Sequence, residues 1–246
     1  MPAIDAELVD LYEEIADCPR CELARTRTQT VPASGPASAD LMFIGEAPGQ
    51  REDEQGLPFV GPSGRFLDEL LASIGRSRET VYICNIVKCR PPGNRDPQPE
   101  EIAACQPFLD RQIEIVNPKV IATLGRYSMA RWFAGTTISR VHGKPTRVDG
   151  RIIVPMYHPA AALHRGDLRE VLMADFAQLP ALLAGADDGP EDRSLAGAMA
   201  PVSAASRPAA QSSAAQSSAA QSSAVQIPAP QALAPQAPPT QQKRLL

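Results

Sequence analysis

Two features are missing from this chain of 246 residues. It has no apolar run long enough to cross a membrane, and residues 1–15 are acidic and amphipathic, unlike a signal peptide. We therefore expect a cytoplasmic protein with no membrane association. Structural disulfides are disfavoured in that reducing compartment, so its 5 cysteines are better suited to metal binding, redox chemistry or core packing.

The chain also lacks a strong excess of charge of either sign. Its formal net charge of -4 gives no indication of nucleic-acid binding. Locally, Lys88, Arg90 and Arg95 form a basic cluster close to residues that we assign below to a cleft. A solvated surface of mixed charge is the alternative explanation for this cluster.

Large apolar residues are scarce in the C-terminal part of the chain. Residues 199–240 are almost entirely Ala, Ser, Gln and Pro, and the repeat Q-S-S-A-A begins at Gln211 and again at Gln216. Such a composition cannot bury enough apolar surface to offset the entropy of ordering the chain. We therefore expect a folded domain at residues 1–186 and a disordered tail at residues 187–246.

The first 186 residues show an alternation of apolar runs and helical patterns. Runs typical of buried strands lie at residues 41–44, 81–87, 120–124 and 152–156. Helical patterns lie at residues 64–74, 99–116, 126–133 and 167–183. This alternation predicts an α/β fold with a parallel sheet covered by helices on both faces.

Unusual residues follow three of the predicted strands. The segment G-E-A-P-G at residues 45–49 follows the first strand, Asn85 lies near the end of the second, and His158 follows the fourth. Ligands bind beyond the carboxyl ends of parallel strands, so we expect these residues to converge on one cleft. Because successive side chains of a strand point to opposite faces, Cys84 is expected to pack in the core.

Four of the 5 cysteines form a spaced set. Cys18 and Cys21 occur as C-P-R-C, and Cys89 and Cys105 come from two later segments. Four thiolates from three segments are typical of a metal or iron–sulfur site that joins distant parts of a chain. The spacing alone leaves zinc and a four-iron cluster open, and burial as small apolar side chains is a further alternative.

The most specific string is G-E-A-P-G-Q-R-E-D-E-Q-G-L-P-F-V-G-P-S-G, at residues 45–64. Its glycines and prolines allow a ligand to approach the backbone closely. Phe59 offers a flat apolar face within this loop, and filling a small core of the loop itself is the alternative role for that side chain.

Several motifs together resemble the family 4 uracil-DNA glycosylases, the iron–sulfur branch of the uracil-DNA glycosylase superfamily. They are the string at residues 45–64, Y-I-C-N-I-V-K-C-R-P-P-G-N-R at residues 82–95, the spaced cysteines, and H-P-A-A-A-L at residues 158–163. The resemblance covers residues 7–180. It implies a three-layer α/β/α fold with a central four-stranded parallel sheet. It also implies hydrolysis of the N-glycosidic bond of deoxyuridine in DNA, which is the first step of base excision repair.

The same resemblance implies a 4Fe-4S cluster on Cys18, Cys21, Cys89 and Cys105 and makes zinc the lesser alternative. The cluster is expected to be structural. It would brace the segment immediately after Asn85.

The resemblance also implies roles for residues of the expected cleft. Asn85 matches the uracil-reading asparagine, whose amide faces uracil N3–H and O4 together, whereas cytosine presents the opposite pattern. Phe59 matches the aromatic ring on which uracil stacks. His158 matches the histidine near uracil O2, where an N–H donor stabilises the negative charge that develops as the bond breaks. Capping a turn is the alternative role for Asn85.

The first motif departs from the better-known branch of the superfamily, in which an aspartate positions the attacking water. That place is Ala47 here, so Glu46 is the expected group for positioning water or the loop, and the general base stays open. The backbone amides of residues 45–49, including those of Gly45, Ala47 and Gly49, are the alternative contacts to uracil. In that branch a large aromatic side chain blocks the methyl group of thymine, and Gly49 stands at its place here. The sequence therefore does not explain how thymine is excluded.

Leu163 lies where the family inserts a side chain into the base stack that the flipped nucleotide leaves. Its alternative role is to anchor its loop to the core. His164 lies on the same loop, and Arg165 is placed to hold a phosphate. The expected partner is therefore uracil-containing DNA, single- or double-stranded, bound by a monomer.

The peptide Gln242-Lys243-Arg244-Leu245-Leu246 resembles the short clamp-binding peptides of bacterial replication and repair proteins. It predicts tethering to the replication sliding clamp through the disordered tail.

The sequence leaves two other activities open. One is a broader deaminated-base DNA glycosylase, and the other is a non-catalytic iron–sulfur or zinc module that binds nucleic acid or transfers electrons.

Overall fold

The structure is a computed structural model that describes residues 6–186. The predicted disordered tail and the predicted clamp-binding peptide, Gln242 to Leu246, lie outside the described residues. Among the helices of the described part, none is both long enough and apolar enough to span a bilayer.

A five-stranded sheet forms the centre of the fold, in the order β2-β1-β3-β5-β4. Its strands are β1 (Leu41–Gly45), β2 (Tyr82–Asn85), β3 (Val120–Leu124), β4 (Thr146–Val148) and β5 (Arg151–Met156). Every residue of β1, β2 and β3 is buried, which explains why these strands read as continuous apolar runs. The four predicted strands are confirmed and pair in parallel.

The fifth strand, β4, is absent from the sequence prediction. It is a three-residue edge strand that pairs antiparallel with β5. The turn between them is Asp149-Gly150, and both residues have positive φ angles, 48° and 74°. Asp-Gly is a strong signal for a two-residue hairpin, so the sequence did contain the information for this strand.

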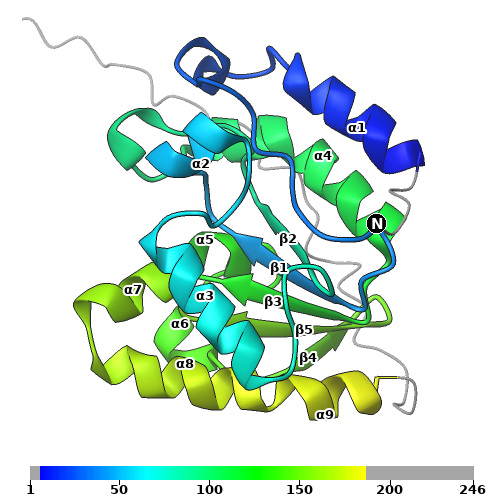
Figure 1. The fold of residues 1–246 in the computed structure, drawn as a ribbon, viewed down its shortest axis with the longest axis vertical. Coiled ribbons are helices and arrows are strands. Elements are labelled where there is room, and N and C mark those ends of the chain that lie inside the picture. The colour runs from blue at the N-terminus through cyan, green and yellow to red at the C-terminus, as the bar shows by residue number, and fades with distance from the viewer. Residues whose placement is uncertain (1–5, 187–246) are drawn as a thin grey trace, which may run out of the picture. The chain divides into compact units, whose positions relative to one another are not determined.

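Helices cover both faces of the sheet and give the expected three layers (Figure 1). One face carries α1 (Ala6–Ala16) and α4 (Pro99–Val116), and the other carries α3 (Pro62–Ser73), α8 (Asp167–Ala177) and α9 (Leu179–Ala184). The helix predicted at residues 167–183 is thus two helices. Pro180 explains the break, because proline has no N–H to continue the ladder and fits the first turn of a new helix.

Short helical segments connect these layers. They are the 3-10 turns η1 (Glu22–Arg25) and η2 (Pro92–Asn94) and the helices α2 (Gln50–Gln55), α5 (Arg126–Met129), α6 (Ile138–Val141) and α7 (Pro159–His164). The helix predicted at residues 126–133 is therefore shorter than expected.

Two apolar clusters fill the space between the layers. Met42, Ile44, Tyr82 and Cys84 belong to the cluster that includes residues of α1 and α4. Their neighbours along the same strands face the other cluster, as the alternation of side chains requires. Cys84 has no exposed surface, which confirms its predicted place in the core.

The order of the strands determines where a ligand can bind. The chain passes from β1 through α3 to β2 on one side of β1, then returns through α4 to β3 on the other side. Such a reversal creates a crevice at the carboxyl ends of the strands. Gly45, Asn85 and Met156 are the residues at which β1, β2 and β5 end.

Candidate active site

A cavity of about 370 Å³ opens at this edge of the sheet. Six of the residues that were predicted for the cleft line this cavity: Glu46, Ala47, Gly49, Phe59, Asn85 and His158. Pro48, Glu52, Ser63, Pro91, Asn94, Arg95 and Ala160 complete its wall. The structure thus brings segments from three strand ends and the loop before α3 into one pocket.

Asn85 lines this pocket, and Gly45, which was also predicted for the cleft, lies beside it without lining the cavity. The two residues are paired in the parallel register of β1 and β2. A Cβ atom on residue 45 would lie 2.3 Å from Asn85 Oδ1 and 2.6 Å from Cζ of Phe59. These distances are shorter than any real contact, so only glycine allows both side chains to take these positions.

Asn85 has an unsatisfied polar atom in the pocket. Asn85 is 2% exposed, and its Oδ1 accepts no hydrogen bond from the described residues. A buried acceptor without a partner costs about 1–3 kcal/mol. The Oδ1 atom therefore caps no turn and is available to a ligand that brings an N–H group.

Phe59 has an unusual backbone conformation. Its φ angle is 55°, in the left-handed region, which costs roughly 1–2 kcal/mol for a residue with a bulky side chain. The ring packs into the apolar cluster beneath α3 and also lines the pocket. It faces the ring of His158 with the two centroids 5.5 Å apart and an interplanar angle of 22°.

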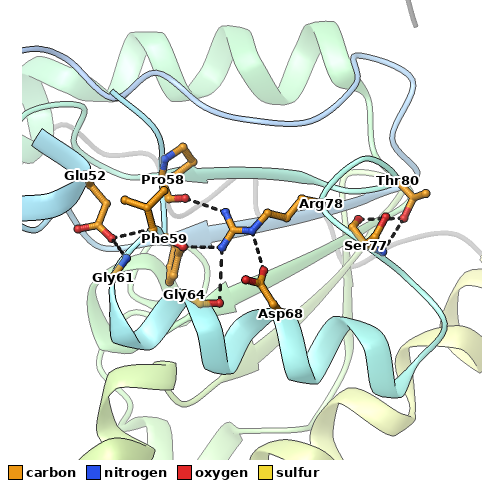
Figure 2. Close-up of polar contacts among 10 residues, drawn as sticks. Glu52, Pro58, Phe59, Gly61, Gly64, Asp68, Ser77, Arg78 and Thr80 are labelled. Atoms are coloured by element: carbon orange, nitrogen blue, oxygen red, sulfur yellow. Dashed lines mark hydrogen bonds and ion pairs between the residues drawn. The ribbon is translucent and has the colours of Figure 1, made fainter. Parts of the chain in front are cut away.

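Arg78 holds the Phe59 loop from the side of α3 (Figure 2). Its Nη1 donates to the carbonyl oxygen of Pro58 at 2.9 Å, and its Nη2 donates to the carbonyl oxygen of Phe59. Its Nε donates to Asp68 at 2.6 Å. The guanidinium thus fixes both carbonyl groups next to the strained residue.

Glu52 holds the same loop from the opposite side. Its carboxylate is largely buried, at 8% residue exposure. Oε1 accepts from the backbone N–H groups of Val60 and Gly61 at 2.9 and 2.8 Å, and Oε2 accepts from that of Gly49 at 3.1 Å. One side chain therefore joins the glycine-rich first motif to the loop that presents Phe59.

His158 is partly buried at the start of α7, where it serves as the N-cap. Its Nδ1 accepts a hydrogen bond from the backbone N–H of Ala160 at 3.1 Å. Burial lowers the pKa of His158 to about 4. The imidazole is therefore neutral near pH 7, and because Nδ1 is an acceptor, the single proton resides on Nε2.

Glu46 is half-buried in the pocket wall. Burial raises its pKa to about 6, the nearby carboxylate of Asp96 acts in the same direction, and Arg126 acts in the opposite one. A carboxyl group with a pKa near neutrality can exchange a proton with a water molecule more readily than an ordinary glutamate.

The predicted DNA-binding residues lie together at the end of α7. Leu163 is 47% exposed, so it does not anchor its loop to the core. His164 is also exposed, and Arg165 forms an ion pair with Asp167 at 2.5 Å. These side chains form an exposed patch beside the helix that begins at His158.

The prediction of a basic cluster at Lys88, Arg90 and Arg95 is wrong for Lys88. That lysine is 1% exposed and cannot contact DNA. Arg95 lines the pocket, and its guanidinium binds both oxygens of Glu101, at 2.6 and 2.9 Å.

The four spaced cysteines gather on the α4 side of the sheet, where all of them contact one apolar cluster. Cys89 Sγ accepts a hydrogen bond from Arg27 Nη1, and Cys105 Sγ accepts one from the backbone N–H of Lys88, both at 3.3 Å. Burial raises the pKa of Cys89, and the neighbouring Cys21 and Cys18 act in the same direction, so these sulfurs lie close enough to interact.

No three His, Cys, Asp or Glu side chains of residues 6–186 are arranged to hold a single metal ion. A single zinc ion requires all four sulfurs about 2.3 Å from one point. A four-iron cluster binds each thiolate through a different iron, so its ligands are spaced more widely. The structure shows the four thiols in one neighbourhood with N–H donors to two of them.

Sequence reasoning missed Glu52 and Arg78. Glu52 follows Gly49 by three positions at the start of α2, and this spacing is that of a capping box. The sequence thus contained a signal for its contact with Gly49. Arg78 gave no such signal, because its acceptors are carbonyl groups distant in the chain.

Comparisons with known proteins agree with this fold and pocket. The model of the uracil DNA glycosylase superfamily matches residues 32–178. A "Type-4 uracil-DNA glycosylase" of Sulfurisphaera tokodaii is 45% identical over 182 residues, which cover 70% of this chain and 83% of the relative. The protein of the same name from Archaeoglobus fulgidus is 48% identical over 181 residues, which cover 70% and 91%. That of Thermotoga maritima is 43% identical over 175 residues, which cover 69% and 91%.

The superfamily match is consistent with the α/β fold and with a pocket at the carboxyl ends of its strands. The identities and coverage of the relatives narrow the class further. This chain belongs to the type-4 uracil-DNA glycosylases.

The environment of His158 predicts an abnormal titration. The chain has 3 histidines, and His158 is expected to titrate near pH 4 instead of the usual 6.5. Between these pH values the unfolded chain binds a proton that the folded protein does not, so the free energy of unfolding falls as the pH drops from 6.5 toward 4. Imidazole NMR titration, with His158→Gln to assign the signal, checks this, and a midpoint near 6.5 would contradict it.

Proposed function

We propose that this protein hydrolyses the N-glycosidic bond of deoxyuridine in DNA and leaves an abasic site for base excision repair. The observation that supports this most directly is the unpaired Oδ1 of Asn85, buried beside Phe59 and a neutral His158. The names of the relatives, at 43–48% identity, support the same activity.

Substrate entry requires the target nucleotide to leave the base stack. The cavity of about 370 Å³ accommodates one pyrimidine, and its floor lies at the strand ends, where a stacked base cannot reach. Leu163, exposed at the end of α7, fills the gap that the flipped base leaves in the duplex. His164 and Arg165, on the same exposed patch, contact the neighbouring backbone.

Uracil is selected by the pattern of its hydrogen-bonding edge. The Oδ1 of Asn85 accepts from uracil N3–H, and the amide nitrogen donates to O4, while Phe59 stacks on the ring. Cytosine presents an acceptor at N3 and a donor at N4, so both groups of the amide would lose their partners. Ala47 and Gly49 line the pocket beside this edge. The N–H of Gly49 already donates to Glu52 Oε2, so the backbone amide of Ala47 is the one that completes the binding edge.

Bond cleavage places negative charge on the departing uracil. The Nε2–H of His158 donates to uracil O2 and stabilises this charge more than it stabilises the neutral substrate. Glu46 holds the attacking water at the sugar carbon and takes up its proton as the carbon–oxygen bond forms. A raised pKa of about 6 suits this carboxylate to the task.

Cys18, Cys21, Cys89 and Cys105 hold a 4Fe-4S cluster in this proposal. The supporting observations are their shared neighbourhood and the N–H donors to two of their sulfurs. When bound, the cluster braces the N-terminal segment, the loop after β2 and helix α4 against one another. The clamp-binding peptide, the monomeric state and the cytoplasmic location stay predictions from the sequence.

The activity is tested with oligonucleotides that contain a single U, T, hypoxanthine or xanthine, followed by alkaline cleavage of abasic sites. We expect cleavage at U, in single or double strands, and loss of about 10²-fold to 10³-fold in rate in His158→Ala. Asn85→Ala should lose U cleavage as well. Absence of cleavage at U with the unaltered protein would refute the function, and cleavage at hypoxanthine or xanthine would broaden it.

The raised pKa of Glu46 predicts how kcat depends on pH on the acid side. If its carboxylate positions water, kcat falls as the pH drops through about 6, because the protonated acid cannot accept the proton. Glu46→Gln should be slow at every pH and should lack this limb. Single-turnover rates from pH 5 to 8 measure it, and an unchanged limb in Glu46→Gln would assign the titration to another group.

The four-cysteine site predicts a coloured protein. Anaerobically purified protein should absorb broadly near ~400 nm and contain iron, and Cys105→Ser should lose both. Cys84→Ser is the matched control, because Cys84 is also buried in the same apolar cluster but is not one of the four spaced cysteines. Bound zinc without iron in the unaltered protein would contradict the cluster.

A further inference from the structure

Lys88 is a buried cation whose charge the proposed mechanism does not use. It lies in the loop after β2, between Asn85 and Cys89, and is 1% exposed. It is among the largest fully buried side chains of the described residues. A lysine is almost never buried to this extent unless its charge is paired.

The hydrogen-bond partners of the ammonium group are neutral. Lys88 Nζ donates to the backbone carbonyl oxygen of Asn85 at 2.6 Å and to Oε1 of Gln112 at 2.5 Å. Within the part of the chain that the structure describes, no carboxylate forms an ion pair with it. Burial of an ammonium ion without an opposite charge costs several kcal/mol, so this arrangement calls for a negative group nearby.

The spaced cysteines beside the Lys88 main chain are groups that can supply this negative charge. The backbone N–H of Lys88 donates to Cys105 Sγ at 3.3 Å. Lys88 also directly precedes Cys89 in the chain, so the residue that carries the ammonium adjoins two of the four spaced cysteines. Arg27, which donates to Cys89 Sγ, is a second cation at the same site.

Helix α4 connects the two sides of this arrangement. Gln112 and Cys105 lie two turns apart on α4, so both side chains point toward the sheet, and both are buried. Gln112 is itself fixed, because its Nε2 donates to the carbonyl oxygen of Pro32 at 3.0 Å. The Lys88 side chain therefore links a fixed point on α4 to the main chain of Asn85.

We propose that Lys88 is a positioning residue with two linked effects. It fixes the carboxyl end of β2, and so the amide of Asn85, and it supplies buried positive charge to the anionic four-cysteine group. This inference rests on the proposed function, because it requires both an Asn85 that reads uracil and a cluster with net negative charge.

Two variants separate these effects. Lys88→Met removes the charge and the hydrogen bond to Asn85 at nearly constant length. Gln112→Glu places a carboxylate against the ammonium, so it cancels the charge and keeps the hydrogen bond to Asn85. Lys144→Met is the control, because Lys144 is exposed and donates to a backbone carbonyl, that of Arg140, at 2.7 Å.

The measurements are iron content, the midpoint potential of the cluster, the rate of iron loss to a ferrous chelator, and single-turnover kinetics on U-containing DNA. Both variants should lose iron faster than the unaltered protein and shift the potential to more negative values, since a nearby positive charge favours the reduced state. Lys88→Met should lower kcat on the order of 10-fold to 100-fold with a smaller change in KM. Gln112→Glu should lose less of kcat than Lys88→Met.

Each outcome decides a separate question. An unaltered protein without iron or without uracil excision would refute the proposed function and not the role of Lys88. With an active, iron-loaded protein, control-like iron loss in both variants overturns the charge effect, and a control-like kcat in Lys88→Met overturns the positioning effect. If Lys88→Met fails to load iron, the test rests on Gln112→Glu. A midpoint potential of the Gln112→Glu cluster that is equal to or more positive than that of the unaltered protein overturns the proposal.

Discussion

Close contact between the carboxyl ends of β1 and β2 is the constraint on which the pocket depends. Gly45 and Asn85 are paired there, and the missing side chain of Gly45 leaves room for both the Asn85 amide and the Phe59 ring. The two side chains could not approach one another over any other residue. Because the contact is made by backbone hydrogen-bonded strands in a fully buried sheet, the position of the amide is as rigid as the core.

The Phe59 loop shows how this rigidity extends beyond the sheet. A left-handed phenylalanine is unfavourable by itself and persists only where its neighbours determine its conformation. Arg78 binds the carbonyl groups before and at this residue, and Glu52 binds the N–H groups that follow it. The loop therefore presents a fixed ring to the pocket before any ligand arrives, which reduces the entropy lost on binding.

The sequence predicted the parts of the fold that depend on local patterns. Buried strands gave continuous apolar runs, and the strand-end rule placed Asn85, His158 and the first motif in one pocket. Arg78 was missed because it acts on carbonyl groups, which every residue has. Glu52 was missed although its spacing from Gly49 is that of a capping box. Lys88 was misread as a surface base because charge in a sequence does not reveal burial, and its neighbours Asn85 and Gln112 become visible only in three dimensions.

Burial affects each of the polar groups of the pocket. It favours the uncharged form of the ionisable groups and leaves the amide oxygen without a hydrogen-bond partner. His158 stays neutral, Glu46 has a raised pKa, and Asn85 Oδ1 has no partner in the described chain. A neutral N–H donor interacts weakly with a neutral base and strongly with the anion that forms as the bond breaks. The poorly solvated surroundings enlarge this difference, because less water screens the developing charge. In the proposed mechanism, a protonated histidine at this place would also attract the anionic product strongly, so the lowered pKa of His158 would weaken retention of the product.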